Sequence, residues 1–263
     1  MGERMRLNFA QFGSDGPPLI ILHGLFGSAR NWRGVAKQLA ERYTVYTLDL
    51  RNHGTSPHAD KMDYVAMSAD VLGFMQQQSL ASAIVLGHSM GGKVAMELAL
   101  SDTGKVSKLI VVDIAPVTYQ HNFDDVLAGL YHVPLDTVSC RKDAEAYLAE
   151  KISDTGLRQF LLQNLAVNTA GGYQWRVNLA SIEDEMPSIM GFSLDGDRVY
   201  SGKTQFIRGG KSTYLASRYQ SAIADMFPNM TFETVKKAGH WPHIESPREF
   251  MSVLNTFLDE AKA

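Results

Sequence analysis

The sequence predicts an α/β fold in which helices flank a mostly parallel central sheet and a helical cap is inserted between two of the strands. Short runs that are apolar on both faces alternate with helical patterns near both ends of the chain, as in buried parallel sheets. One such run, residues 83–87, is joined to a helical stretch by the turn Gly87 to Gly91. Between residues 118 and 190 the alternation stops, and helical patterns follow one another without strands.

Composition limits the class of protein. The 263 residues suffice for one large core with an insertion. Charged residues make up 20% and the formal net charge is -3, so the basic excess typical of nucleic-acid-binding proteins is absent. The lone Cys140 excludes an internal disulfide and a zinc site of several cysteines. No apolar run is long enough to span a bilayer and no secretory signal follows Met1, so we expect a cytoplasmic protein.

The first elements are expected in the order strand, strand, helix. Residues 7–12 alternate in polarity like an edge strand, and residues 19–22 are apolar on both faces like a central parallel strand. The glycine-rich loop 23–28 follows and leads into a helix over residues 31–42. His23, at the end of the central strand, is expected to brace this loop by hydrogen bonding.

The next expected elements are a strand over residues 44–49, a polar loop over 50–56 and a helix over 64–79. A further strand, over residues 108–113, ends in a carboxylate. Ligands of open parallel sheets bind beyond the carboxyl ends of the strands. Four polar residues lie at or just past such ends: His23, Asp49, Ser89 and Asp113.

The turn at Ser89 carries the clearest chemical signal. It matches G-x-S-x-G, with the required buried strand before it and a helix after it, and small residues Gly92 and Ala95 where that helix crosses the sheet. In such a turn the serine backbone is strained and its hydroxyl is exposed. The helix that follows adds N–H groups and a positive dipole end, which favour an oxyanion beside Ser89.

The region in which strands no longer alternate with helices, residues 118–190, is expected to be an all-helical cap, or lid. Residues 1–117 and 191–263 are then expected to form the core. The helical patterns cover residues 123–131, 142–152 and 157–167. Aromatic residues of this region, among them Tyr119 and Phe123, can line an acyl pocket or pack the cap against the core.

The remaining elements are expected at residues 204–207 (strand), 215–226 (helix), 231–235 (strand) and 247–258 (helix). Gly210-Lys211-Ser212 resembles the end of a phosphate-binding loop, but Gln205 stands where that motif needs a glycine.

A serine hydroxyl needs a base to take its proton and a third group to orient that base. His240 follows the last strand directly after Gly239, so its loop opens on the same sheet edge as Ser89. His88 adjoins Ser89, but neighbours on a tight turn point apart. The other candidates lie in loops or in the cap: His53, His58, His121, His132 and His243.

With serine before histidine along the chain, the sequence resembles the α/β-hydrolases over essentially its full length. The phrases at residues 23–28 (HGLFGS), 49–54 (DLRNHG), 87–92 (GHSMGG) and 239–240 (GH) further resemble the bacterial YbfF-like esterases and their mitochondrial relatives. This resemblance implies a hydrolase of short- or medium-chain acyl esters, with acyl thioesters such as acyl-CoA as a further option, and no cofactor. It also implies an oxyanion hole formed by the N–H groups of Leu25 and Met90, with Phe26 as a pocket wall.

The acid position departs from the common pattern. Many α/β-hydrolases carry the acid just after the strand that is residues 204–207 here, yet the sequence from Gly209 to Thr213 has no carboxylate. Asp195 and Asp197 precede that strand and so lie at its wrong end. Asp113, one strand earlier and at the correct end, is therefore expected to be the acid.

Two other classes of function stay open at this point. The same triad and cap serve hydrolases of carbon–carbon bonds and lyases, and a non-catalytic member can retain the fold as a ligand-binding protein. An intact set of Ser89, His240 and Asp113 argues against the second. The expected partner is a small-molecule ester or thioester, and oligomeric state is not readable from the sequence.

Overall fold

The computed structural model describes residues 5–121, 123–193 and 197–260. Within these ranges seven strands form one sheet in the order β1-β3-β2-β4-β5-β8-β9. β1 pairs antiparallel with β3, and every other neighbouring pair is parallel. The strands are β1 (Phe9–Phe12), β2 (Pro18–Leu22), β3 (Thr44–Leu48), β4 (Ala83–His88), β5 (Val106–Val112), β8 (Thr204–Gly209) and β9 (Met230–Val235).

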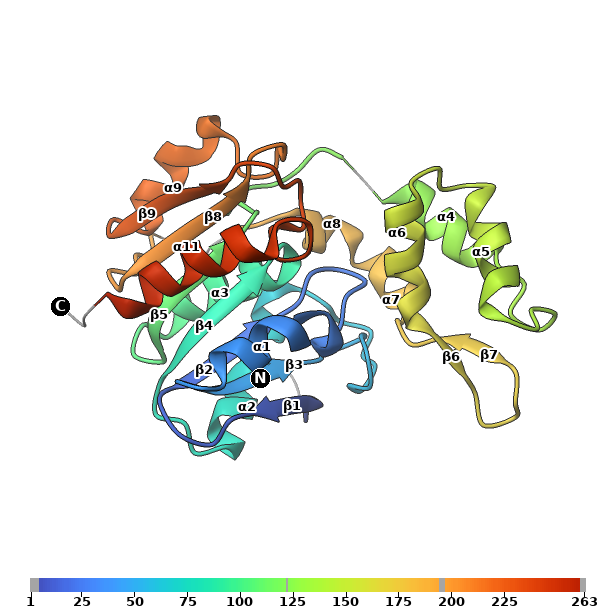
Figure 1. Ribbon diagram of the computed structural model, residues 1–263, viewed down its shortest axis with the longest axis horizontal. Helices are drawn as coiled ribbons and strands as arrows, with labels where there is room; N and C mark the ends of the chain where they lie inside the picture. Colours follow the sequence, from blue (N-terminus) through green and yellow to red (C-terminus); the bar gives the residue numbers. More distant parts are fainter. Residues whose placement is uncertain (1–4, 122, 194–196, 261–263) are drawn as a thin grey trace.

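Helices cover both faces of this sheet (Figure 1). One face packs against α1 (Arg33–Leu39) and α11 (Pro247–Asp259), whose apolar residues share a core with Leu19 and Ile21 of β2. The other face packs against α2 (Tyr64–Gln77), α3 (Met90–Ser101) and α9 (Gln220–Met226). Because helices cover both faces, the central strands are buried on both sides. Their sequences are therefore continuous apolar runs.

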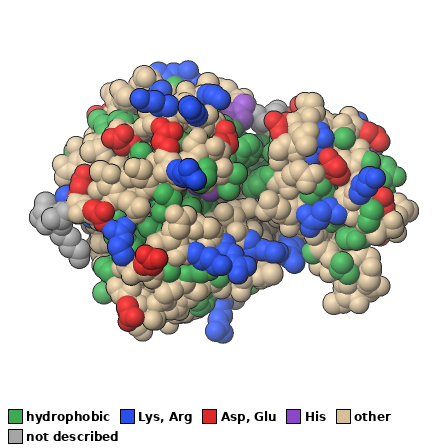
Figure 2. Space-filling view, in the orientation of Figure 1, with side chains coloured by type: hydrophobic (Ala, Val, Ile, Leu, Met, Phe, Trp, Pro, Cys, Tyr) green, Lys and Arg blue, Asp and Glu red, His purple; other side chains and the backbone are tan. Residues whose placement is uncertain are grey.

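The segment between β5 and β8 leaves the sheet and lies beside its carboxyl edge (Figure 1). It contains α4 (Asp124–His132), α5 (Arg141–Ala149), α6 (Thr155–Leu161), the 3-10 turn η2 (Leu162–Asn164), β6 (Leu165–Val167), β7 (Tyr173–Trp175), α7 (Leu179–Asp184) and α8 (Met186–Met190). Figure 2 shows apolar side chains along the hollow between this segment and the sheet core.

The expectation of an all-helical insertion is wrong at one place. Residues 165–167, assigned by periodicity to the end of a helix, form a strand that pairs antiparallel with residues 173–175. A short apolar run fits either structure, because three residues do not distinguish a period of 3.6 from a period of 2. Gly171, with φ of 88°, allows the turn that brings the two strands together.

Other differences concern the ends of helices. The helix expected over residues 31–42 is a 3-10 turn, η1 (Ala29–Trp32), followed by the shorter α1. The helix expected from residue 215 begins with η3 (Ser217–Tyr219) and becomes α-helical only at Gln220. A short helix after the last strand, α10 (Pro242–Glu245), had no periodic signal because it makes a single turn.

Candidate active site

Ser89 lies at the turn between β4 and α3, as the G-x-S-x-G spacing predicts. Its backbone has φ of 51° and ψ of -122°, a conformation that non-glycine residues rarely adopt. The flanking glycines let strand and helix approach, since a Cβ atom at Gly87 would lie 2.1 Å from the Gly91 carbonyl oxygen. At Gly91 a Cβ atom would lie 2.5 Å from the carbonyl oxygen of Leu22. The local sequence therefore produces a strained turn that presents the serine at the sheet edge.

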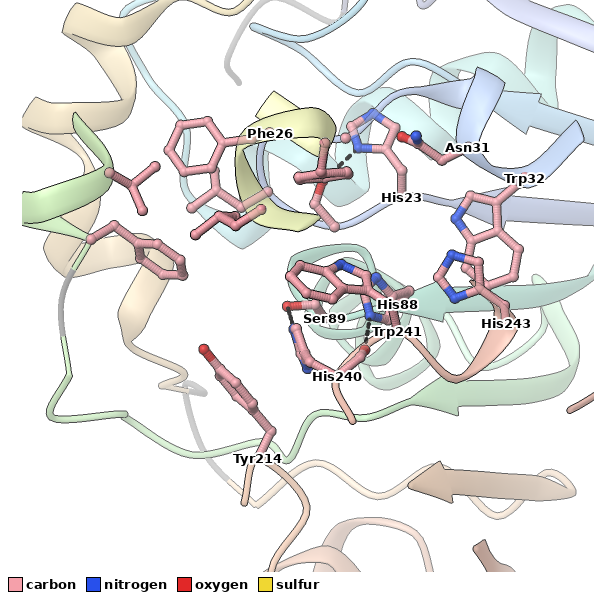
Figure 3. Close-up of a pocket in the computed structure, with 17 residues that line it drawn as sticks. His23, Phe26, Asn31, Trp32, His88, Ser89, Tyr214, His240, Trp241 and His243 are labelled. Atoms are coloured by element: carbon pink, nitrogen blue, oxygen red, sulfur yellow. Dashed lines mark hydrogen bonds between the residues drawn. The ribbon is translucent and has the colours of Figure 1, made fainter. Parts of the chain in front are cut away.

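An unbroken line of hydrogen bonds runs from Asp113 through His240 to Ser89. Figure 3 shows the part of this line that joins His240 to Ser89. His240 Nδ1 lies 2.7 Å from Asp113 Oδ2, and His240 Nε2 lies 3.0 Å from Ser89 Oγ. Because an ionised carboxylate only accepts hydrogen bonds, Nδ1 carries the imidazole proton and Nε2 accepts from the serine hydroxyl. This is the tautomer that a general base requires.

Asp113 is held by more than the histidine. It is fully buried directly after β5, and its Oδ1 accepts a hydrogen bond of 3.0 Å from the Gly209 N–H. Ser212 Oγ donates to Asp113 Oδ2 over 2.5 Å. Of the rival acids, Asp197 precedes β8 and lies outside this network, while Asp195 lies outside the described residues. Ser212 thus contacts the acid rather than replacing it.

The backbone donors near Ser89 differ in their availability. The Met90 N–H begins α3 and is one of the N-terminal helix groups that lack an intrahelical acceptor. The Phe26 N–H is used, because it donates to His53 Nε2 over 3.1 Å. Gly27 N–H closes the same turn onto the Gly24 carbonyl, and within the described part of the chain the Leu25 N–H has no acceptor. The described residues therefore leave the backbone N–H groups of Leu25 and Met90 without an acceptor.

Two buried histidines support the loop that carries Leu25. His23 Nδ1 donates to the Gly24 carbonyl and its Nε2 accepts from the Leu50 N–H, so it braces the loop as predicted. His53 Nδ1 donates to the Arg51 carbonyl while its Nε2 accepts from Phe26. Burial lowers the pKa of His23 and lowers that of His53 to about 3, so both rings stay neutral braces near pH 7.

Ser89 and His240 open into a cavity of about 220 Å³. One side of it is apolar, with Phe26 from the loop after β2 and with residues of the insertion, namely Phe123, Val126, Leu157 and Phe160. Phe26 and Phe123 meet edge to face with ring centroids 6.0 Å apart. The insertion thus supplies most of the apolar wall opposite the nucleophile.

Tyr119, the third residue expected to line the pocket, does not border this main cavity but still lies close to the nucleophile. It borders a smaller cavity of about 20 Å³ that also reaches Ser89. Its hydroxyl donates to the Tyr214 carbonyl over 2.5 Å and accepts from the Ala115 N–H, which holds the ring in the core. These two hydrogen bonds fix the position of the ring, because a buried phenol is placed by its hydrogen-bond partners.

Several residues at the site carried no sequence signal. Tyr214 stacks on His240 with ring centroids 4.1 Å apart, although it lies in a loop without a recognisable motif. Lys93, one turn after Ser89 on α3, is 1% exposed and donates to the carbonyls of Met190 and Gly191 at the end of α8. Burial lowers its pKa to about 7.

Among the described residues no cluster of three or more His, Cys, Asp or Glu side chains is arranged to hold a metal ion.

Comparison with known proteins places the chain in a class. Residues 19–253 match the alpha/beta hydrolase family, and the chain belongs to this family. It is 31% identical over 261 residues to esterase YbfF of Escherichia coli, covering 99% of this chain and 100% of that protein. It is also 40% identical over 250 residues to the mouse protein named sn-1-specific diacylglycerol lipase ABHD11, covering 92% of this chain and 81% of that one.

A solved structure titled marine microorganism esterase superposes with a TM-score of 0.94 at 37% identity, covering 96% of this chain and 99% of the other. These relatives confirm the expected α/β-hydrolase fold and the resemblance to YbfF-like esterases. Within the family the chain is a carboxylic ester hydrolase. No described helix is both long and apolar enough to cross a membrane.

Proposed function

We propose that the protein hydrolyses short- to medium-chain acyl esters through an acyl-enzyme on Ser89, with His240 as general base and acid and Asp113 as the orienting carboxylate. The observation that supports this most directly is the pair of hydrogen bonds, 2.7 Å and 3.0 Å long, that join Asp113 to His240 and His240 to Ser89. A ligand-binding protein without turnover has no need to hold a serine in a strained turn against a histidine.

In the acylation step Ser89 Oγ attacks the ester carbonyl carbon while its proton passes to His240 Nε2. The carbonyl oxygen gains negative charge and accepts hydrogen bonds from the N–H groups of Leu25 and Met90. When this intermediate collapses, the bond between the carbonyl carbon and the alkoxy oxygen breaks. His240 then gives its proton to the departing alcohol, which leaves the acyl group on Ser89.

In the deacylation step a water molecule replaces the serine as the nucleophile. It gives a proton to His240 Nε2 as its oxygen attacks the acyl carbon, and the same two N–H groups receive the oxyanion. Collapse returns the proton to Ser89 Oγ and releases the carboxylic acid. In both steps the positive imidazolium faces the buried Asp113 carboxylate, which Gly209 and Ser212 hold in place.

The cavity limits the acyl group in this proposal. Residues 118–190 act as a cap, because Phe123 directly before α4, Val126 of α4 and Leu157 of α6 line the pocket. Each methylene that fits against this wall contributes about 0.8 kcal/mol until the cavity is full. Thioesters present the same carbonyl to Ser89, and their hydrolysis stays a prediction from the family resemblance. Carbon–carbon cleavage and lyase reactions stay the alternative to ester hydrolysis, because the same triad and cap serve them.

A serine-directed aryl phosphonate tests the nucleophile. We expect one adduct per chain, found by peptide mass spectrometry on the peptide that contains Ser89, and no adduct in Ser89→Ala. Ser188→Ala, a substitution at an exposed serine of α8, is the matched control and should be labelled normally. Labelling that persists in Ser89→Ala would place the nucleophile elsewhere.

A further inference from the structure

The cavity at Ser89 has a second side that is polar and is built from histidines. His88 and His243 both line it, together with Trp32 and Asn31. Figure 3 shows Phe26 on one side of Ser89 and the stacked rings of His243 and Trp32 on the other. His23 and His53 have partners on both ring nitrogens, whereas His88 and His243 each have a ring nitrogen without a partner among the described residues.

His88 has a hydrogen-bond partner on one of its two ring nitrogens in the part of the chain that the structure describes. It is 3% exposed, and its Nε2 lies 2.7 Å from the carbonyl oxygen of His240. A carbonyl only accepts hydrogen bonds, so Nε2 carries the proton and Nδ1 keeps a free lone pair. Within the described residues no donor reaches this Nδ1. His88 therefore offers an acceptor at the edge of the cavity.

Neither ring nitrogen of His243 has a hydrogen-bond partner in the described ranges of the chain. It is 5% exposed, and its ring stacks on Trp32 with centroids 4.0 Å apart and planes inclined by 11°. Among the described residues its Nδ1 is fully enclosed without a partner, and no hydrogen bond to Nε2 is found. An N–H group enclosed without an acceptor is costly, so the tautomer with the proton on Nε2 is favoured. His243 thus offers a donor from a ring that lines the cavity.

Both rings are neutral near pH 7. Burial lowers the pKa of His243 to about 3 and lowers that of His88 well below its ordinary value. Their centroids are 5.1 Å apart, so one oxygen atom can lie within hydrogen-bond distance of a nitrogen on each ring. A neutral donor beside a neutral acceptor matches a hydroxyl group, which donates and accepts through the same atom.

We propose that His88 and His243 form a subsite for a hydroxyl group on the alcohol part of the ester, so that the preferred substrates are esters of hydroxylated alcohols. This inference rests on the proposed function. The alcohol side is assigned because His240 must protonate the leaving oxygen, and the His88 ring lies 4.9 Å from the His240 ring. The acyl chain then takes the apolar side formed by Phe26 and the cap.

Two isosteric substrates test the subsite. 2-Hydroxyethyl butanoate and propyl butanoate share their acyl group and differ only in a hydroxyl in place of a methyl group. In the wild-type protein we expect kcat/KM to be about tenfold higher for the hydroxyethyl ester, because the propyl ester leaves both imidazole nitrogens unpaired. A ratio of one or below in the wild-type protein would overturn the proposal without any variant.

Variants at His243 locate the effect. His243→Phe keeps a flat ring against Trp32 but removes the N–H, and we expect the selectivity ratio to fall to about one. His243→Gln retains a donor and should recover part of the ratio. His132→Phe makes the same exchange on the outer surface of α4 and is the matched control, with an unchanged ratio. An unchanged ratio in His243→Phe would contradict the assignment.

The readout separates this inference from the proposed function. If the proposed function fails, neither ester is hydrolysed and the phosphonate does not label Ser89. If only the subsite fails, both esters are hydrolysed through Ser89 at equal kcat/KM. The ratio also cancels any general loss of active protein in a variant, because both substrates are measured on the same preparation.

Discussion

Replacing Asp113 by asparagine should disable the base without changing the shape of the site. The Gly209 N–H donates to Asp113 Oδ1, so the asparagine must keep its oxygen on that side. Its NH₂ group then occupies the place of Oδ2 and faces His240 Nδ1 and Ser212 Oγ. The serine hydroxyl can rotate to accept a hydrogen bond. The imidazole can accept only by moving its proton to Nε2, and in that tautomer it no longer receives the proton of Ser89.

The size of the effect follows from the loss of the correct tautomer and of the charge that faces the imidazolium. In serine proteases the same exchange lowers kcat by roughly 10⁴, which corresponds to about 5.5 kcal/mol. Asp113 is fully buried here, so water has little access to replace the carboxylate. We expect Asp113→Asn to lower kcat by roughly 10² to 10⁴ with little change in melting temperature.

The assay is steady-state turnover of an aryl butanoate, with the melting temperature measured on the same samples. Asp197→Asn, at the opposite end of β8, is the matched control and should stay within a few-fold of the wild-type kcat. Ser212→Ala removes one donor to Asp113 but leaves the carboxylate and should also have a small effect. Near-normal turnover in Asp113→Asn together with collapse in Asp197→Asn would refute the reasoning.

Two further predictions concern the pocket wall and two buried histidines. Phe123→Ala should move the optimum of kcat/KM to longer acyl chains, with a gain of roughly fourfold for each additional methylene accepted; an unchanged chain-length profile would show that Phe123 is not the wall. Burial lowers the pKa of His53 and His243 to about 3, so below about pH 6.5 the unfolded chain binds protons that the folded chain does not. The two together should lower the free energy of unfolding by about 2 kcal/mol between pH 6 and pH 5, and urea denaturation should show His243→Phe losing about half of this dependence.

Much of the site could be predicted because its signals are local. A serine between two glycines, after a buried strand and before a helix, can only make a strained turn, so the geometry at Ser89 follows from sterics over a few residues. The positions of His23 and Asp113 at strand ends follow from the alternation of strands and helices. For the same reason the sheet and most helix positions were predicted, whereas the ends of short helices were not.

Tertiary structure decided what depends on residues far apart in the chain. Asp113 became the hydrogen-bond partner of His240 because β5, β8 and β9 are neighbours in the sheet, which brings Gly209, Ser212 and His240 to one carboxylate. Residues 165–167 became a strand because a partner lay eight residues further on, not because of their own periodicity. His88 and His243 have ring nitrogens without partners among the described residues, and this depends on which donors and acceptors surround the rings after folding. Periodicity and spacing describe the backbone of one segment, whereas a hydrogen-bond partner or a pocket wall is set by the packing of several segments together.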